Sequence, residues 1–130
     1  MIKATNEQVL LYGIKDPDKE RKLKAILIRM GVRIRNISTD ACHQKVGYLA
    51  GIKGFEQIEA SDMTKQPVQD EMLIMRGFTN ARLDLLLKEM RKNNITINLK
   101  AIMTDHNQHW NLYELYEELK KEHEAMSQKA

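Results

Sequence analysis

The stretch from residue 71 to residue 101 constrains the fold of this chain more than any other part. It opens with an apolar run at Met72–Met75, the pattern of a strand that is covered on both faces. An apolar helical face and an alternating strand follow, formed by Leu83, Leu86, Leu87 and Met90 and then by Ile95, Ile97 and Leu99. The stretch therefore predicts one strand–helix–strand (βαβ) unit.

Residues 9–37 repeat this pattern in a degenerate form. Their helical positions are Leu23, Ile26, Leu27 and Met30, at the spacing of the later unit. Asp16 followed by Pro17 is a favourable helix start, and Gly31 is a favourable stop. The pattern fits either an internal repeat or two independent βαβ units, and both interpretations stay open.

Two such units predict an α/β fold with a four-stranded sheet and a C-terminal helix. We expect strands near Gln8–Tyr12, Val32–Ile37, Glu71–Arg76 and Ile95–Met103, and helices near Pro17–Met30, Asn80–Lys92 and Leu112–Ala125. The first and third strands are apolar on both faces, so they should be central, with the third antiparallel to the first. This favours the ferredoxin-like strand order 4-1-3-2, and the doubly wound order 2-1-3-4 is the alternative.

A chain of 130 residues is long enough to form one core. We expect a single α/β domain over residues 1–130, with an irregular insert at residues 38–69 and a frayed tail at residues 127–130. No apolar run approaches the ~20 residues that span a bilayer, and the N-terminus lacks the apolar segment of a secretory signal. The lone cysteine, Cys42, fits a reducing compartment. These features predict a cytoplasmic protein that does not contact the membrane.

The irregular insert contains an apolar island at Val46–Ile52, which predicts a short covering helix or the lid of a site. The spacing of Gly47, Gly51 and Gly54 invites comparison with a phosphate-binding loop. The Gly-Lys-Ser/Thr ending of such a loop is missing, so a segment packed closely on the sheet is favoured.

Basic residues gather between Lys15 and Arg35, where eight of them accompany three acidic residues. Such a cluster could bind nucleic acid, and Lys22, Arg29, Arg33 and Arg35 are its candidate contacts. No aromatic residues interleave with the basic ones, as a surface that stacks on bases requires. A solvated helix face with an arginine-bearing edge strand is therefore favoured, and nucleic-acid binding is the alternative.

The histidines form no complete metal or catalytic constellation. His106 and His109 stand beside Asp105, while Cys42 and His43 lie in another loop, and the spacing matches no zinc signature. We therefore predict no catalytic residue, no metal site and no cofactor.

Strand-to-helix junctions are better candidates for binding, because such junctions often line ligand crevices in α/β sheets. Gly13 and Gly77 mark two of them, and a polar loop before the last helix marks a third. The candidate ligand-binding residues are Gly13, Tyr48, Gly77, Thr104, Asn107 and Trp110.

Several blocks over nearly the whole chain resemble a known family. They are Leu10–Gly13, Val46–Gly51, Gly77, Phe78, Leu99–Thr104, Asn107, Trp110, Tyr113–Leu115, Glu117 and Glu118. Together they are similar to a family of small uncharacterised bacterial proteins that is classed as a domain of unknown function. The resemblance implies no activity, cofactor or site residue.

The sequence as a whole favours a non-catalytic module that binds a small ligand or a protein partner, with a regulatory role and with the option of homodimerisation. Nucleic-acid binding through Lys15–Arg35 is the first alternative. A small enzyme that uses His43, or His106 with His109, is the second.

Overall fold

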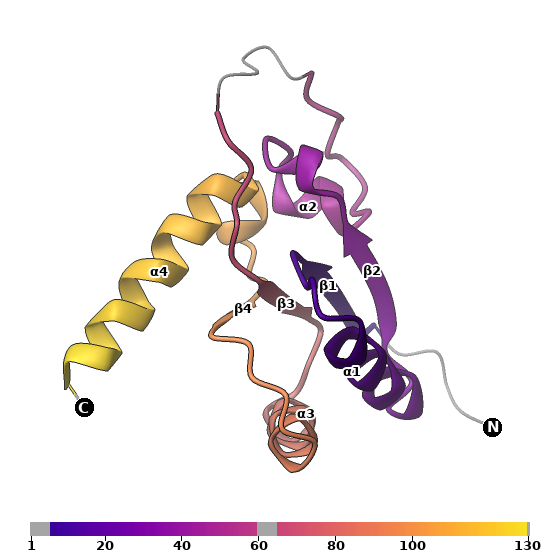
Figure 1. Ribbon diagram of the computed structural model, residues 1–130. Coiled ribbons are helices and arrows are strands. Elements are labelled where there is room, and N and C mark those ends of the chain that lie inside the picture. The colour runs from indigo at the N-terminus through magenta and orange to yellow at the C-terminus, as the bar shows by residue number, and fades with distance from the viewer. Residues whose placement is uncertain (1–5, 60–64, 130) are drawn as a thin grey trace.

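The computed structural model describes residues 6–59 and 65–129, and it forms one sheet with helices on both faces (Figure 1). The strands are β1 (Gln8–Tyr12), β2 (Arg33–Ile37), β3 (Met72–Arg76) and β4 (Leu99–Ile102). The helices are α1 (Pro17–Arg29), α2 (Val46–Leu49), α3 (Asn80–Lys92) and α4 (Leu112–Lys129), with short 3₁₀ turns η1 (Thr39–Ala41) and η2 (Asn107–His109). No helix within the described ranges is long and apolar enough to cross a membrane.

The four strands lie in the order β2-β1-β3-β4. The ferredoxin-like order 4-1-3-2 is therefore wrong, and the alternative order 2-1-3-4 is confirmed. β2 pairs with β1 and β4 pairs with β3 in parallel, whereas β3 runs antiparallel to β1, as expected. In the expected order β3 would lie between β1 and β2, whereas here β2 pairs directly with one edge of β1 and β3 pairs with the other edge. Each βαβ unit thus keeps its own two strands side by side, and β4 pairs with β3 rather than with β1.

One face of the sheet is covered by α1 and α3. Its buried cluster comprises Val9, Leu11, Leu23, Ile26, Leu27, Val32, Leu73, Met75, Leu86, Met90, Ile95 and Ile97. The two central strands contribute alternate residues to it, as the pleat of a strand requires. Both crossover helices lie on this face, and they also contact each other.

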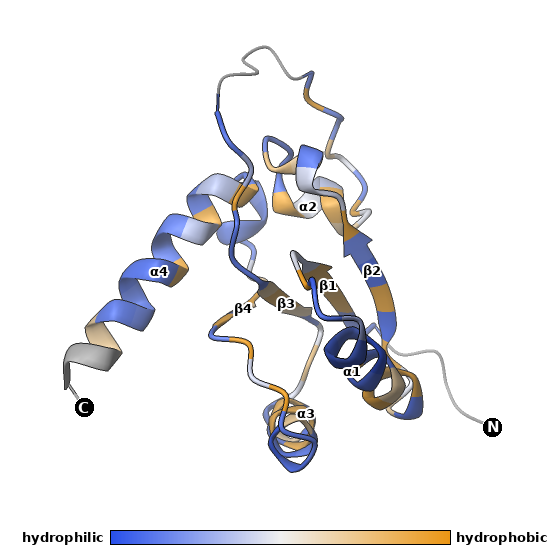
Figure 2. Ribbon diagram, viewed as in Figure 1, coloured by the Kyte–Doolittle hydropathy of each residue, from blue (hydrophilic) through white to orange (hydrophobic). Residues whose placement is uncertain are grey.

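The opposite face is covered by η1, α2 and α4. Its buried cluster comprises Leu10, Tyr12, Ile37, Cys42, Val46, Leu49, Ala50, Val68, Met72, Ile74, Leu99, Ala101, Leu112, Leu115 and Leu119. Figure 2 shows apolar residues along the strands and many hydrophilic residues along α1 and α4. Because both faces of β1 and β3 are buried, these strands are central and β2 and β4 are edges, as predicted.

Local signals place the helix ends correctly. The side chain of Asp16 accepts hydrogen bonds at the start of α1, and Thr79 Oγ1 accepts one from the backbone N–H of Arg82 at 3.2 Å. Asn94 adopts the left-handed conformation (φ 57°) that stops α3. Asn111 and Glu114 exchange side-chain-to-backbone bonds of 2.9 Å at the start of α4, a capping box.

Two predicted elements differ from the structure by more than one residue at an end. The fourth strand pairs with β3 only over Leu99–Ile102, not over the whole expected range of residues 95–103. Ile95 and Ile97 instead bury their side chains in the cluster beneath α1 and α3, before the chain reaches the edge of the sheet. The last helix continues to Lys129, beyond the predicted end at Ala125.

Candidate functional site

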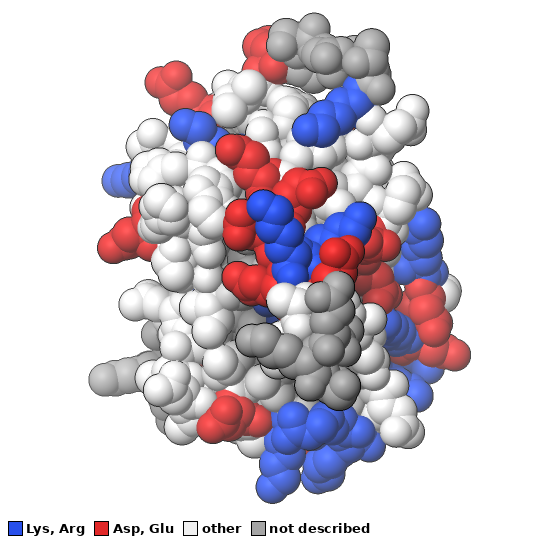
Figure 3. Space-filling model, turned by 90° about the vertical axis from the view of Figure 1, so that its left-hand side faces the viewer, with Lys and Arg blue, Asp and Glu red and all other residues white. Residues whose placement is uncertain are grey.

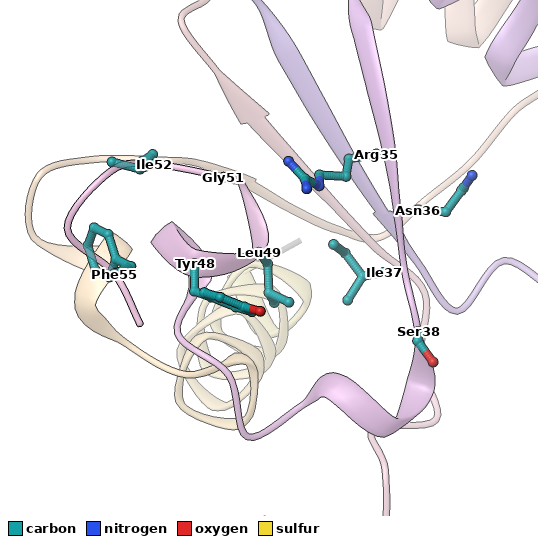
Figure 4. A pocket seen from close by; sticks show the side chains of 9 residues that line it. All are labelled: Arg35, Asn36, Ile37, Ser38, Tyr48, Leu49, Gly51, Ile52 and Phe55. Atoms are coloured by element: carbon teal, nitrogen blue, oxygen red, sulfur yellow. The ribbon is translucent and has the colours of Figure 1, made fainter. Parts of the chain in front are cut away.

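A pocket of about 330 Å³ opens between the edge strand β2 and the short helix α2 (Figure 4). It is lined by Arg35, Asn36, Ile37, Ser38, Tyr48, Leu49, Gly51, Ile52 and Phe55. The apolar island of the insert therefore forms a short covering helix, and one wall of the pocket belongs to it. The other wall is the last part of β2 and the residue that follows it.

Arg35 is the charged group of this pocket. It faces the same side of the sheet as Ile37, because alternate strand residues share a face. Its guanidinium lies against Gly51, where an added Cβ would come within 2.5 Å of Arg35 Nη1. Gly51 also has a positive φ of 80°, so glycine suits both the turn and the close approach of the arginine. None of the ion pairs among the described residues involves Arg35.

Tyr48 and two aliphatic side chains form the less polar part of the pocket. Figure 4 shows the tyrosine hydroxyl turned toward Leu49 and Ile37, while Arg35 points toward Gly51. Asn36 and Ser38 point away from Tyr48 in the same view. The pocket thus combines one cationic group and one phenol with both polar and apolar lining residues.

The two glycines of the predicted binding rim lie at opposite ends of the sheet. β1 and β3 are antiparallel, so the junctions after them cannot share an edge. Gly13 packs on the backbone of Asp70, and Gly77 packs on the backbone of Asn6. Of the expected ligand contacts, only Tyr48 lines the pocket beside β2.

The loop before α4 uses its polar groups internally. Thr104 N–H donates to Asn107 Oδ1 at 2.8 Å, and Asn107 N–H donates to Thr104 Oγ1 at 3.0 Å. The Trp110 carbonyl accepts from the N–H of Val46 at 2.8 Å, which joins this loop to α2. Tyr48 and Trp110 consequently pack against the same core cluster. A ligand contact at Thr104, Asn107 or Trp110 stays a prediction.

The four candidate nucleic-acid contacts are divided between two faces. Lys22 and Arg29 are exposed on α1, whereas Arg33 and Arg35 project from β2 toward the side that carries α2. Arg29 Nη2 also lies 3.8 Å from the carboxylate of Glu89. The side of the molecule that carries α4 mixes acidic and basic side chains (Figure 3). A nucleic acid that contacts all four basic residues would have to wrap around the edge strand.

The histidines do not converge. His43 Nε2 lies 3.2 Å from Gln44 Nε2, the His106 ring meets Trp110 edge-on, and the His109 ring lies 5.2 Å from the ring of Phe55. Within residues 6–59 and 65–129, no group of three or more His, Cys, Asp or Glu residues could hold a metal ion. The hypothesis of a small enzyme stays a prediction without an assembled set of catalytic groups.

The sequence predicted Arg35 as a solvated residue of an edge strand, with nucleic-acid contact as the alternative, and it did not single out Gln44 or Phe55. A signal for Arg35 is present in the sequence: this arginine alternates with Ile34 on an edge strand, and the apolar island at Val46–Ile52, which contains Gly47 and Gly51, follows later in the chain. No comparable signal marks Gln44, because its role depends on a residue far along the irregular insert.

A family model matches part of the chain. Residues 71–126 match the model of a family described as a domain of unknown function (DUF3783), which confirms the expected resemblance over these residues. The match runs from β3 into α4 and leaves out β2 and α2, which form the pocket. No curated protein and no solved structure matches the chain.

Proposed function

We propose that this protein is a non-catalytic binding module whose pocket between β2 and α2 takes a small molecule with a carboxylate or phosphate group. The observation that carries the proposal is Arg35, a pocket-lining arginine that pairs with no acidic side chain in the described part of the chain. A guanidinium offers a planar fork of donors that fits both carboxylate and phosphate oxygens.

The rest of the pocket supports a ligand with an apolar portion. Leu49, Ile52 and Phe55 line it beside the polar groups, and Tyr48 adds a hydroxyl. Ligand pockets in proteins commonly combine such an apolar lining with a few fixed polar groups and enclose roughly 300–1,000 Å³. A volume of about 330 Å³ fits a ligand of metabolite size.

Thermal shift with a panel of carboxylates and phosphates tests the proposal, with succinate, glutamate, inorganic phosphate and adenosine monophosphate as probes. A ligand at ~100 times its dissociation constant stabilises a fold by roughly 2.7 kcal/mol, which raises the melting temperature of a domain of this size by several degrees. We expect Arg35→Gln to abolish the shift. Arg33→Gln is the matched control, since Arg33 is an exposed arginine on the same strand and the same side but does not line the pocket.

A shift that survives Arg35→Gln would contradict the proposal. A short RNA in the same panel tests the alternative function. RNA binding that weakens in both arginine variants and falls steeply with salt would favour nucleic acid over a small anion.

The proposal includes a cytoplasmic location, in keeping with the single cysteine of the chain. It assigns no cofactor to the pocket.

A further inference from the structure

A second feature lies beside the pocket, in the residues that follow α2. Residues 53–59, called the strap below, cross the surface formed by η1, α2 and η2. Phe55 packs on Gly47 of α2 and against the ring of His109 in η2, and Ile58 is bonded to Gln44, just after η1. The strap therefore touches this surface through two side-chain positions that are three residues apart.

At Ile58 the contact is made by the side-chain amide of Gln44, which hydrogen-bonds as a backbone amide would. Gln44 Nε2 donates to the Ile58 carbonyl at 2.9 Å, and Gln44 Oε1 accepts from the Ile58 N–H at 2.8 Å. These are the two hydrogen bonds that a residue in a neighbouring strand would exchange with it. Gln44 is only 4% exposed, so an unpaired amide there would be unfavourable. Both bonds of the Gln44 amide go to the backbone of Ile58 and neither goes to its side chain.

At Phe55 the contact is between the aromatic ring and the backbone of Gly47 in α2, which forms a seat for the ring. A Cβ on Gly47 would lie 2.6 Å from Phe55 Cε2 and Cζ, so the ring rests on α2 where a side chain is missing. The His109 ring, 5.2 Å away between centroids, closes the other side of the seat. An aromatic side chain suits this position because its flat face fits between helix backbone and imidazole.

The strap is exposed on its outer side and flanked by open space. Glu56, Gln57 and Glu59 are exposed, and Ile58 is 38% exposed. Hollows of about 530 and 470 Å³ lie along it, one lined by residues including Lys53 and His109, the other by residues including His43 and Glu59. None of the strap residues belongs to either of the two core clusters.

We infer that the surface of Gln44, Gly47 and His109 is a receptor for a peptide segment of a partner protein, and that the strap occupies it when no partner is bound. The strap supplies the recognition pattern: an aromatic residue, then a branched aliphatic residue three positions later. Main-chain bonds give affinity and side-chain seats give specificity, as in other strand-like modes of peptide recognition. Gln44, Gly47 and His109 do not line the pocket of Arg35, but Phe55 of the strap does, so release of the strap would remove one lining side chain of that pocket.

A tethered segment competes strongly with any free peptide. For short connections the effective concentration of such a segment is of order millimolar, so a free peptide binds the unchanged chain only weakly. Weakening the strap should expose the receptor and raise the apparent affinity of a peptide in solution.

The first experiment uses a labelled synthetic peptide with the sequence of residues 53–59, KGFEQIE, and fluorescence anisotropy. We expect the doubly substituted chain Phe55→Ala, Ile58→Ala to bind it at least tenfold more tightly than the unchanged chain. A peptide with alanine at both anchor positions is the control and should not bind. No binding to the doubly substituted chain at millimolar peptide, with an NMR spectrum that shows a folded protein, would overturn the inference.

The second experiment alters the peptide, so that folding of the protein is not affected. Methylation of the backbone nitrogen at the isoleucine position removes the donor to Gln44 Oε1 and should weaken binding about tenfold, the effect of one lost hydrogen bond. Gly47→Ala in the doubly substituted chain should weaken the unmodified peptide similarly, because the new methyl group fills the aromatic seat. Unchanged affinity after methylation would show that the backbone is not read, and it would also overturn the inference.

Discussion

Arg82 binds the carboxylate of Glu7 with two hydrogen bonds, 2.8 Å from Nε and 2.7 Å from Nη2. The same guanidinium donates to the carbonyl of Met30. Glu7 is only 5% exposed and immediately precedes β1, while Arg82 lies in the first turn of α3 and Met30 caps the end of α1. One arginine thus joins both βαβ units at one end of the sheet.

Removal of this arginine should be strongly destabilising. Arg82→Gln would leave the buried carboxylate of Glu7 without its charged partner. Breaking a fully buried pair lowers the free energy of unfolding by about 3–5 kcal/mol, and because the Arg82 side chain is 33% exposed we expect a loss of about 2–3 kcal/mol. Urea denaturation measures the loss. The control is Lys19→Gln, which breaks the 2.6 Å pair with Glu71; both of those side chains are partly exposed, so we expect about 1 kcal/mol or less. Equal losses in the two variants would contradict the central role of the Glu7–Arg82 pair.

The buried tyrosine of β1 should make the fold sensitive to alkaline pH. Burial raises the pKa of Tyr12 above the ordinary value of 10.0, and its hydrogen bond with Cys42 adds to the shift. Above pH 10 the unfolded chain loses this proton while the folded protein keeps it. The free energy of unfolding should therefore fall as the pH rises beyond about 10.

Tyr12→Phe tests this pH dependence. The variant loses the donor to the Val68 carbonyl, a bond of 2.6 Å, so we expect a loss of about 1–3 kcal/mol at neutral pH. Its stability should then fall less steeply above pH 10 than that of the unchanged chain. Tyr113 and Tyr116 also have raised pKa values, and Lys100 has a lowered pKa that acts in the opposite direction. All three groups remain in the variant, so the difference in slope between the two proteins reports Tyr12 together with Cys42, its hydrogen-bond partner.

Helix ends were predictable because their signals are local. Asp16, Thr79 and Asn94 each act on backbone groups within a few residues, so the chain sequence contains both partners. The strand order was not predictable in the same way. It depends on pairings between residues far apart in the chain, such as Leu10 with Arg35 of β2 and with Ile74 of β3.

The candidate site was predictable only in part, for a similar reason. Tyr48 stood out because it lies in the apolar island, and the structure places it in the pocket. Arg35 becomes a pocket residue only because Gly51, beyond η1 and α2, comes back to contact its guanidinium. Neither alternation nor spacing reports such a contact between an edge strand and a later turn.

Gly77, which follows β3, has both a positive φ and too little room for a side chain. Gly77 has a φ of 80°, and an added Cβ would lie 2.5 Å from the Asn6 carbonyl oxygen. We expect Gly77→Ala to lower the free energy of unfolding by about 3 kcal/mol or more, since backbone strain and a backbone clash add together. Gly54→Ala is the control, because Gly54 also has a positive φ but open space around its Cα, and about 1 kcal/mol is expected. Thermal denaturation of both variants compares their losses of stability. Similar losses would show that the backbone near Gly77 shifts to make room for the added methyl group.

Asn107, in the turn before α4, either stabilises this turn or contacts a ligand, and a substitution distinguishes the two roles. Its side chain accepts from the N–H of Thr104 at 2.8 Å and donates to the carbonyl of Ile102 at 3.0 Å. Asn107→Ala removes both bonds and should lower the free energy of unfolding by about 1–2 kcal/mol, because each such bond contributes roughly 0.5–1.5 kcal/mol. Asn98→Ala, at an exposed asparagine before β4, should change it by less than about 0.5 kcal/mol. If Asn107→Ala instead leaves stability unchanged and removes the response to a ligand, Asn107 contacts the ligand and its hydrogen bonds in the turn contribute little.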